Sequence, residues 1–169
     1  MNIILTGFMG VGKSTVGKIL AQKLELEFID TDEKIEEVHN LSIPEIFAEF
    51  GEEKFREFET EVIQNISQKD RCVISCGGGV VKSEANMNFL KYRGKIVNLY
   101  ASADKIIGNI GNDANRPLIF GKSREEIISL MNERERFYKN CHIRIDVTDL
   151  SADAVADKII SELEGEIND

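Results

Sequence analysis

The chain has 169 residues, of which 42% are hydrophobic and 30% are charged, and this predicts one globular domain over 1–169 with a real core. The same composition excludes a disordered tail, a collagen-like rod and a coiled coil. The net charge of −9 argues against nucleic acid or an anionic membrane as a partner, because both require a net or clustered positive field.

The apolar runs are short, and the cysteines follow no metal-site spacing. Runs such as Ile3-Ile4-Leu5 cannot span a bilayer, and the N-terminus does not have the pattern of a signal peptide. We therefore expect a cytoplasmic protein. Cys72, Cys76 and Cys141 are an odd number without C-x-x-C spacing, and the first two flank a predicted buried strand. We interpret them as small core residues rather than disulfide or zinc ligands.

Apolar runs rich in Ile and Val alternate with helical patterns along the chain, which predicts an α/β protein with a parallel sheet. The runs show little polar alternation, as expected of strands that are covered by helices on both faces. In chain order, the predicted strands are Asn2–Thr6, Glu27–Asp30, Arg71–Ser75, Lys95–Tyr100 and His142–Val147.

Helices are predicted between these strands from the helical spacing of apolar residues and from capping signals. Ser42 with Glu45, and Ser123 with Glu126, have capping-box spacing. The predicted helices are Ser14–Leu24, a short helix from Ser42 that stops at Gly51, Glu52–Gln68, a helix from Ser123 to about Tyr138, and a last helix capped by Ser151.

The segment at about 108–122 breaks the alternation of strands and helices. It contains three glycines and three asparagines. A polar stretch of this length inside a compact domain is usually either a functional lid or a disordered connection.

The strongest motif is Gly7-Phe8-Met9-Gly10-Val11-Gly12-Lys13-Ser14, a full match to the phosphate-binding pattern G-x-x-x-x-G-K-[ST]. It lies directly between the first predicted strand and the first predicted helix, where an incidental glycine-rich turn is a poor alternative. Backbone N–H groups and the helix N-terminus can surround phosphate oxygens there. Lys13 can reach the terminal phosphates, and the Ser14 hydroxyl can hold Mg²⁺. The motif predicts binding of ATP or GTP by Gly10, Val11, Gly12, Lys13, Ser14 and Thr15.

Two carboxylates, Asp30 and Asp32, follow the second predicted strand. The carboxyl ends of parallel strands are where α/β sheets gather ligand groups. Asp30 could bind a water coordinated to Mg²⁺, and Asp32 could accept a hydrogen bond from a substrate hydroxyl and take its proton. The alternative is that Asp32 merely caps the next helix.

Glycines and arginines supply the remaining candidates. Gly77-Gly78-Gly79 follows the third predicted strand, which suggests either a backbone closely approached by a ligand or a plain flexible turn. Arginine forks match carboxylates and phosphates, and the candidates are Arg56, Arg116 and Arg134. Spacing does not separate Arg134 from Arg136. The arginines interpreted as solvated surface residues are Arg124, Arg136 and Arg144.

Taken together, these motifs resemble those of the shikimate kinase family from Gly7 to about Val147. The similarity includes Phe-Ile-Asp-Thr-Asp at 28–32, the triple glycine, Asn-Arg-Pro-Leu at 115–118 and Arg-x-x-x-Tyr at 134–138. The resemblance implies a three-layer α/β/α P-loop fold with a five-stranded parallel sheet of order 2-3-1-4-5. It also implies a substrate-binding helical segment at about 31–62 and a lid at about 108–122.

The resemblance also implies residue roles. Residues implied to bind shikimate are Asp32, Arg56, Gly77, Gly78, Gly79 and Arg134, with the two arginines on its carboxylate and Asp32 on its ring hydroxyls. Lys13 would bridge the transferred phosphate, Arg116 would contact ATP phosphates, and Asp32 is the candidate general base. Ser14 would ligate Mg²⁺, with Asp30 and Ser75 near the metal through water. Arg134 is selected over Arg136 because the family's arginine lies four residues before a tyrosine, here Tyr138.

The chain departs from the family pattern on the adenine side. Members commonly carry a basic residue several positions before the lid Arg-Pro, where this chain has Gly108-Asn109-Ile110-Gly111. The stretch 146–150 also lacks the arginine often found near adenine. These departures predict weaker or backbone-made contacts with the base.

The sequence thus predicts a monomeric kinase that transfers the γ-phosphoryl group of ATP to the 3-hydroxyl of shikimate, with Mg²⁺, on the route to chorismate and aromatic amino acids. One alternative is another P-loop metabolite kinase, acting on gluconate or a nucleotide. A second is a non-catalytic nucleotide-binding regulator. A GTPase switch is disfavoured because the chain has no N-K-x-D motif. A degenerate relative would be expected to lose Lys13, Asp32 or Arg56, and the chain has all three.

Overall fold

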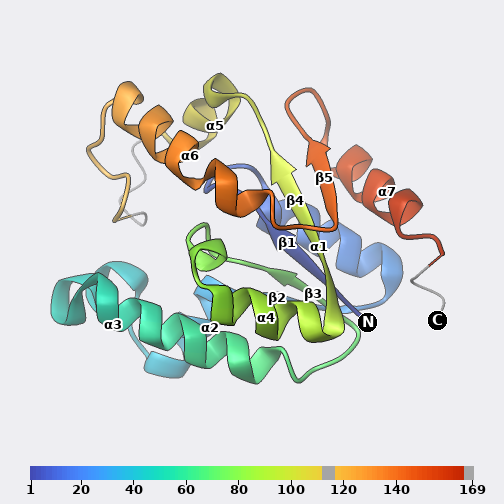
Figure 1. The fold of residues 1–169 in the computed structure, drawn as a ribbon, viewed down its shortest axis with the longest axis horizontal. Helices are drawn as coiled ribbons and strands as arrows, with labels where there is room; N and C mark the ends of the chain where they lie inside the picture. The colour runs from blue at the N-terminus through green and yellow to red at the C-terminus, as the bar shows by residue number, and fades with distance from the viewer. Residues whose placement is uncertain (112–116, 166–169) are drawn as a thin grey trace.

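The computed structural model describes residues 1–111 and 117–165, and these form a five-stranded parallel sheet with helices on both sides (Figure 1). The strands are β1 (Asn2–Thr6), β2 (Glu27–Asp30), β3 (Cys72–Ser75), β4 (Gly94–Tyr100) and β5 (Ile143–Asp146). Their order is β2-β3-β1-β4-β5, so the α/β class and the order implied by the resemblance are confirmed. Every predicted strand is present, and its ends differ by one residue at most.

The centre of the sheet is the core of the protein. Every residue of β1 and β3 is buried, and the two strands pair in register with Ile3 opposite Val73. This explains the near-continuous apolar runs in the sequence, since both faces of these strands are covered. Cys72 and Cys76 are buried free thiols, as predicted, whereas Cys141 is partly exposed.

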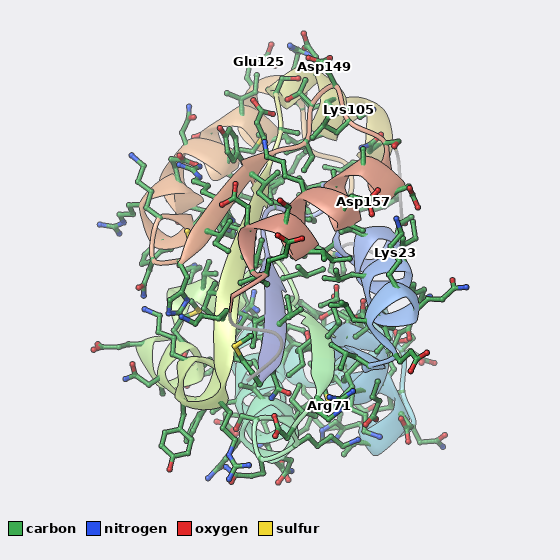
Figure 2. All side chains as sticks on the ribbon, turned by 90° about the vertical axis from the view of Figure 1, so that its right-hand side faces the viewer. Lys23, Arg71, Lys105, Glu125, Asp149 and Asp157 are labelled. Carbon is green, nitrogen blue, oxygen red and sulfur yellow. The ribbon has the colours of Figure 1, made fainter. Side chains whose placement is uncertain are left out.

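Helices cover the sheet in two groups. They are α1 (Lys13–Leu24), α2 (Thr31–His39), α3 (Ile43–Ile66), the 3₁₀ turn η1 (Val80–Lys82), α4 (Glu84–Arg93), α5 (Ala103–Ile110), α6 (Arg124–Tyr138) and α7 (Ala152–Glu162). Figure 1 shows α1 beside α7 on one side and α3 beside α4 on the other. Lys23 of α1 and Asp157 of α7 face each other in Figure 2, with Nζ 2.5 Å from the carboxylate.

Helix α3 contains the two helical segments predicted for its sequence, joined at Gly51. The predicted stop at Gly51 is confirmed, because the backbone there is non-helical, with φ 81° and ψ 174°, and forms a kink between the two segments. The capping box predicted at its start is present, because Ser42 and Glu45 exchange hydrogen bonds. The glycine therefore interrupts the helical geometry and changes the direction of the chain within α3.

Three helices have no counterpart among the predicted elements: α2, which appeared only as the helix that Asp32 could cap, α4 and α5. Each begins at a side-chain cap, supplied by Asp30, Ser83 and Ser102. Helix α5 takes in the first three residues of the predicted lid, Gly108–Ile110. In the part of the chain that the structure describes, no helix has the length and apolar character needed to span a bilayer.

The fold brings the sequence motifs to one edge of the sheet. The phosphate-binding motif follows β1, Asp30 ends β2 and Ser75 ends β3. These strands are parallel neighbours, so their carboxyl ends open on the same side, as is usual for ligand sites in open α/β sheets.

Candidate active site

A cavity of about 760 Å³ lies at the carboxyl ends of the strands. Its walls come from the phosphate-binding loop, the ends of β2 and β3, helices α2, α3 and α6, Asn109 of α5 and the short segment 117–118. Most of the predicted site residues line it: Gly10, Gly12, Lys13, Ser14, Thr15, Asp30, Asp32, Arg56, Ser75, Gly77, Gly78, Gly79 and Arg134. The structure therefore brings together residues that lie more than 120 positions apart.

The phosphate-binding loop wraps the N-terminus of α1. Gly12 caps this helix with φ 100°, a conformation that a side chain with a Cβ rarely adopts. Lys13 is buried, and its Nζ donates to the carbonyls of Gly7 at 2.8 Å and Phe8 at 3.1 Å. The ammonium group is thus held at the loop, beside the helix N-terminus where an anion is stabilised.

Val11 differs from the other predicted phosphate ligands. Its side chain is buried, and its backbone N–H donates to Phe8 O at 3.2 Å. It does not line the cavity. Val11 therefore stabilises the turn of the loop from beneath.

Oxygen atoms gather beside the loop. Ser14 Oγ donates to Asp30 Oδ2 at 2.5 Å and lies 3.2 Å from Ser75 Oγ. Asp30 also caps α2, because its other oxygen accepts from the backbone N–H groups of Asp32 and Glu33. The alternative that Asp32 is the cap is therefore wrong, and the cap holds the Asp30 carboxylate in place.

Asp32 stands in the first turn of α2, directly against the glycine turn. A Cβ on Gly77 would lie 2.7 Å from Asp32 Oδ1, so only glycine leaves room for the carboxylate here. The backbone N–H of Gly77 donates to Thr31 Oγ1 at 2.8 Å. This bond ties the glycine turn to α2.

Arg56 of α3 is held by a buried carboxylate. Its Nη1 donates to both oxygens of Glu59, at 3.0 and 2.9 Å, and Glu59 is 1% exposed. Burial raises the pKa of Glu59 to about 7, and the Arg56 charge offsets only part of this rise. A Cβ on Gly79 would lie 2.4 Å from Arg56 Nη2, so the guanidinium rests on the glycine backbone.

Glu59 is a site residue that the sequence analysis missed, although its signal was present. The apolar stripe of α3 runs through Phe55, Val62, Ile63 and Ile66, and position 59 falls on that stripe. A glutamate at a core position of an amphipathic helix indicates a buried charge with a partner. Arg56, one turn away, is that partner.

Arg134 of α6 is 2% exposed, and its Nε and Nη1 atoms make no hydrogen bond to the described residues. Its guanidinium lies 5.8 Å from the centre of the Phe8 ring. Burying guanidinium N–H groups without hydrogen-bond partners is costly, and Arg134 lines the cavity. This is the arrangement expected of a group that binds an anionic ligand.

Tyr138 fixes the same region from α6. Its hydroxyl donates to Gly78 O at 2.6 Å, and burial raises its pKa to about 12. The hydroxyl therefore stays protonated and keeps donating at physiological pH. The selection of Arg134 over Arg136 agrees with burial, because Arg136 is exposed.

The expectation for Arg144 is wrong. We interpreted it as a solvated surface residue, yet its side chain is 27% exposed and donates to Asn98 and Glu135. The reason is tertiary: β5 places it against β4 and α6.

Arg116, predicted to contact ATP phosphates, lies outside the described residues.

The cavity thus has two chemically different ends. One carries the phosphate-binding loop with Lys13, and the other carries two arginines, two carboxylates and the glycine turn. Apolar side chains line the wall beside the arginines, and they are Met9, Ile43, Phe47, Phe55 and Leu118. A compact ligand with both hydroxyl and carboxylate groups fits the second end.

Comparisons with known proteins agree with this geometry. A model of the shikimate kinase family matches residues 9–164. A shikimate kinase of Caldicellulosiruptor bescii is 46% identical over 161 residues, which are 95% of this chain and 94% of that relative. A shikimate kinase of Geobacter metallireducens is 44% identical over 97% of this chain and 92% of its own length. A solved structure of the Acinetobacter baumannii enzyme in complex with shikimate superposes with a TM-score of 0.93 at 36% identity, covering 98% of this chain and 94% of that chain.

Proposed function

The chain belongs to the shikimate kinase family, and on this premise we propose that it transfers the γ-phosphoryl group of ATP to the 3-hydroxyl of shikimate. The reaction would serve the route to chorismate and the aromatic amino acids. The observation that carries the proposal is one cavity with a phosphate-binding loop at one end and the buried Arg134 beside Arg56 at the other.

On the donor side, the phosphates of ATP would lie against the loop N–H groups and Lys13. In-line transfer of a phosphoryl group needs positioning and charge stabilisation more than covalent chemistry. Lys13 supplies a fixed positive charge at the loop. Arg116 is our proposed second cation on the phosphates.

The oxygen cluster beside the loop suits Mg²⁺. The Ser14 hydroxyl and the Asp30 carboxylate are hard oxygen donors, and they lie within 2.5 Å of each other. Mg²⁺ is commonly bound by one or two such groups together with substrate phosphates and water. We propose that Ser14 holds the ion directly and that Asp30 and Ser75 hold its water ligands. When bound, the ion would neutralise charge on the phosphates.

On the acceptor side, Arg56 and Arg134 would pair with the carboxylate of shikimate, and Asp32 would bind its ring hydroxyls. Glu59 keeps the Arg56 fork oriented. The wall formed by Met9, Phe47 and other apolar residues would cover the ring. Asp32 can take the proton of the attacking hydroxyl. Where proton transfer comes late in a loose transition state, its main contribution is to orient that hydroxyl.

We place the reaction in the cytoplasm, where ATP is available, and propose that the chain acts as a monomer with a lid at about 108–122. Size-exclusion chromatography with light scattering tests the monomer. A mass near 19.0 kDa is expected, and a mass near twice that value would contradict it.

The decisive experiment measures ADP release by purified protein with Mg²⁺ and ATP, with and without shikimate. Gluconate and AMP serve as control acceptors. We expect strong ADP release when shikimate is the acceptor and little release with gluconate, with AMP or without an acceptor. Release with gluconate or AMP would instead indicate another metabolite kinase, and ATP binding without any acceptor response would indicate a nucleotide-binding regulator.

A further inference from the structure

Helix α6 carries Arg134 and packs on the core through side chains that are mostly only partly buried. Only Ile127, Arg134 and Tyr138 are buried among its fifteen residues. It lies beyond the carboxyl ends of the strands, next to α5 (Figure 1). Leu130, Met131 and Phe137 pack against the core while remaining partly exposed, so each gains less from hydrophobic contact than a fully buried side chain would. A polar contact to β5 adds to this packing.

Arg144 of β5 supplies such a contact. Its Nη2 donates to Glu135 at 2.5 Å, and its Nε donates to Asn98 Oδ1 at 3.1 Å. Its guanidinium also lies 4.4 Å from the centre of the Tyr100 ring. The group is held on three sides, and the planar fork of arginine suits this arrangement as lysine would not.

Asn98, the other hydrogen-bond partner of Arg144, lies in the core of the sheet. Asn98 is fully buried in β4, and its amide donates to Thr6 Oγ1 at 3.4 Å. Thr6 is buried at the end of β1, directly before Gly7 of the phosphate-binding loop. A chain of polar contacts thus runs from the central strands to α6.

Glu135 is adjacent to Arg134 in the chain. Successive helical residues point about 100° apart, so Arg134 enters the cavity while Glu135 reaches back to β5. The rotation and depth of α6 at this turn then determine where the Arg134 guanidinium lies.

We propose that Arg144 is a positioning residue that, through Glu135, holds Arg134 in place for the substrate carboxylate. This inference rests on the proposed function, because it takes shikimate as the ligand of Arg134. The phosphate end of the cavity depends less on Arg144, because β1 and β4 are held by the hydrogen bonds of their own strand pairing. Loss of Arg144 should therefore change mainly the position of α6.

The test compares Arg144→Met with a matched control, Arg136→Met. Arg136 is an exposed arginine on α6 whose guanidinium lies over Phe137, so the control removes the same charge. Steady-state assays of ADP release give KM for shikimate, KM for ATP and kcat for each variant. Displacing a binding group by about 1 Å can cost on the order of 100-fold. We expect about a tenfold rise in KM for shikimate in Arg144→Met, with KM for ATP and kcat within about twofold.

Two further variants separate positioning from general loss of structure. Glu135→Gln combined with Arg144→Met should be no worse than Arg144→Met alone, because both act on one connection. Arg144→Lys keeps the charge and can reach one partner at a time. Its KM for shikimate should therefore lie between the values of wild type and Arg144→Met. Thermal unfolding of every variant checks that it is folded at the assay temperature.

The outcomes are distinct. If Arg144→Met matches Arg136→Met, or if both KM values rise equally, the inference is overturned. If Arg134→Ala raises KM for shikimate while Arg144→Met does not, the proposed function stands and the positioning role falls. If wild-type protein releases no ADP in response to shikimate, the proposed function fails and takes this inference with it.

Discussion

The buried carboxylate of Glu59 makes the stability of this protein depend on pH in a way that can be calculated. Burial raises its pKa from 4.5 to about 7 in the folded state, although the charge and hydrogen bond of Arg56 act in the opposite direction. A raised folded-state pKa favours the protonated form on folding. The free energy that Glu59 contributes to the stability of the fold is therefore fully present below pH 4.5, its unfolded-state pKa. It is lost as the pH rises through the folded-state pKa of about 7. Replacing Glu59 with Gln keeps a neutral side chain at every pH and should remove this dependence.

The size of the effect follows from the shift. Each pKa unit corresponds to about 1.4 kcal/mol, so a rise from 4.5 to about 7 corresponds to about 3 kcal/mol at high pH. About 1 kcal/mol of this is already lost at pH 5.5, one unit above the unfolded-state pKa. Between pH 5.5 and pH 8.5, wild-type protein should therefore lose about 2 kcal/mol relative to Glu59→Gln.

The assay is urea denaturation followed by circular dichroism at both pH values, for wild type, Glu59→Gln and Glu61→Gln. Glu61 lies on the same helix but is exposed, so its replacement removes the same charge without removing a buried one. We expect the pH dependence of Glu61→Gln to follow that of wild type. Parallel pH dependence of wild type and Glu59→Gln would refute the reasoning, because it would mean that Glu59 titrates alike in the folded and unfolded chains.

Three further predictions concern the two ends of the cavity. Gly79→Ala should fold, because the three atoms nearest its new Cβ all belong to the flexible end of Arg56. Displacing that charged group should raise KM for shikimate by about 10- to 100-fold, as expected for a lost charge-assisted bond of about 1.5–3 kcal/mol. Gly108→Ala, where a Cβ meets nothing within 4 Å, is its control; equal KM values in the two variants would exclude Arg56 as a carboxylate ligand. Lys13→Ala should lower kcat by at least about 100-fold in a folded protein, and near-normal turnover would refute its role at the phosphates. Asp32→Asn keeps the size of the side chain but removes the base, so it should lower kcat by about 100-fold or more; an effect on KM for ATP alone would contradict its place on the acceptor side.

Much of the site could be predicted from the sequence because its motifs are local. The loop from Gly7 to Ser14 works through backbone N–H groups of consecutive residues, so its chemistry can be inferred from spacing alone. Asp30 could be placed near this loop because parallel strands end at a common edge. The strands themselves were predictable because burial on both faces requires continuous apolar runs.

Other features depended on distant parts of the chain. Glu59 and Arg144 are ordinary charged residues in the sequence, and their roles arise when α3 is buried and β5 is laid against β4 and α6. Arg134 and Arg136 are two positions apart on one helix, and only the rotation of α6 buries the first and exposes the second.

The sequence by itself therefore determined the fold class, the phosphate-binding loop and the types of group in the site, because these follow from short-range pattern and backbone geometry. Tertiary structure alone decided which charged side chains are buried, which partners they have and how their pKa values shift. The reason is that burial and electrostatic environment depend on the packing of elements far apart in the chain.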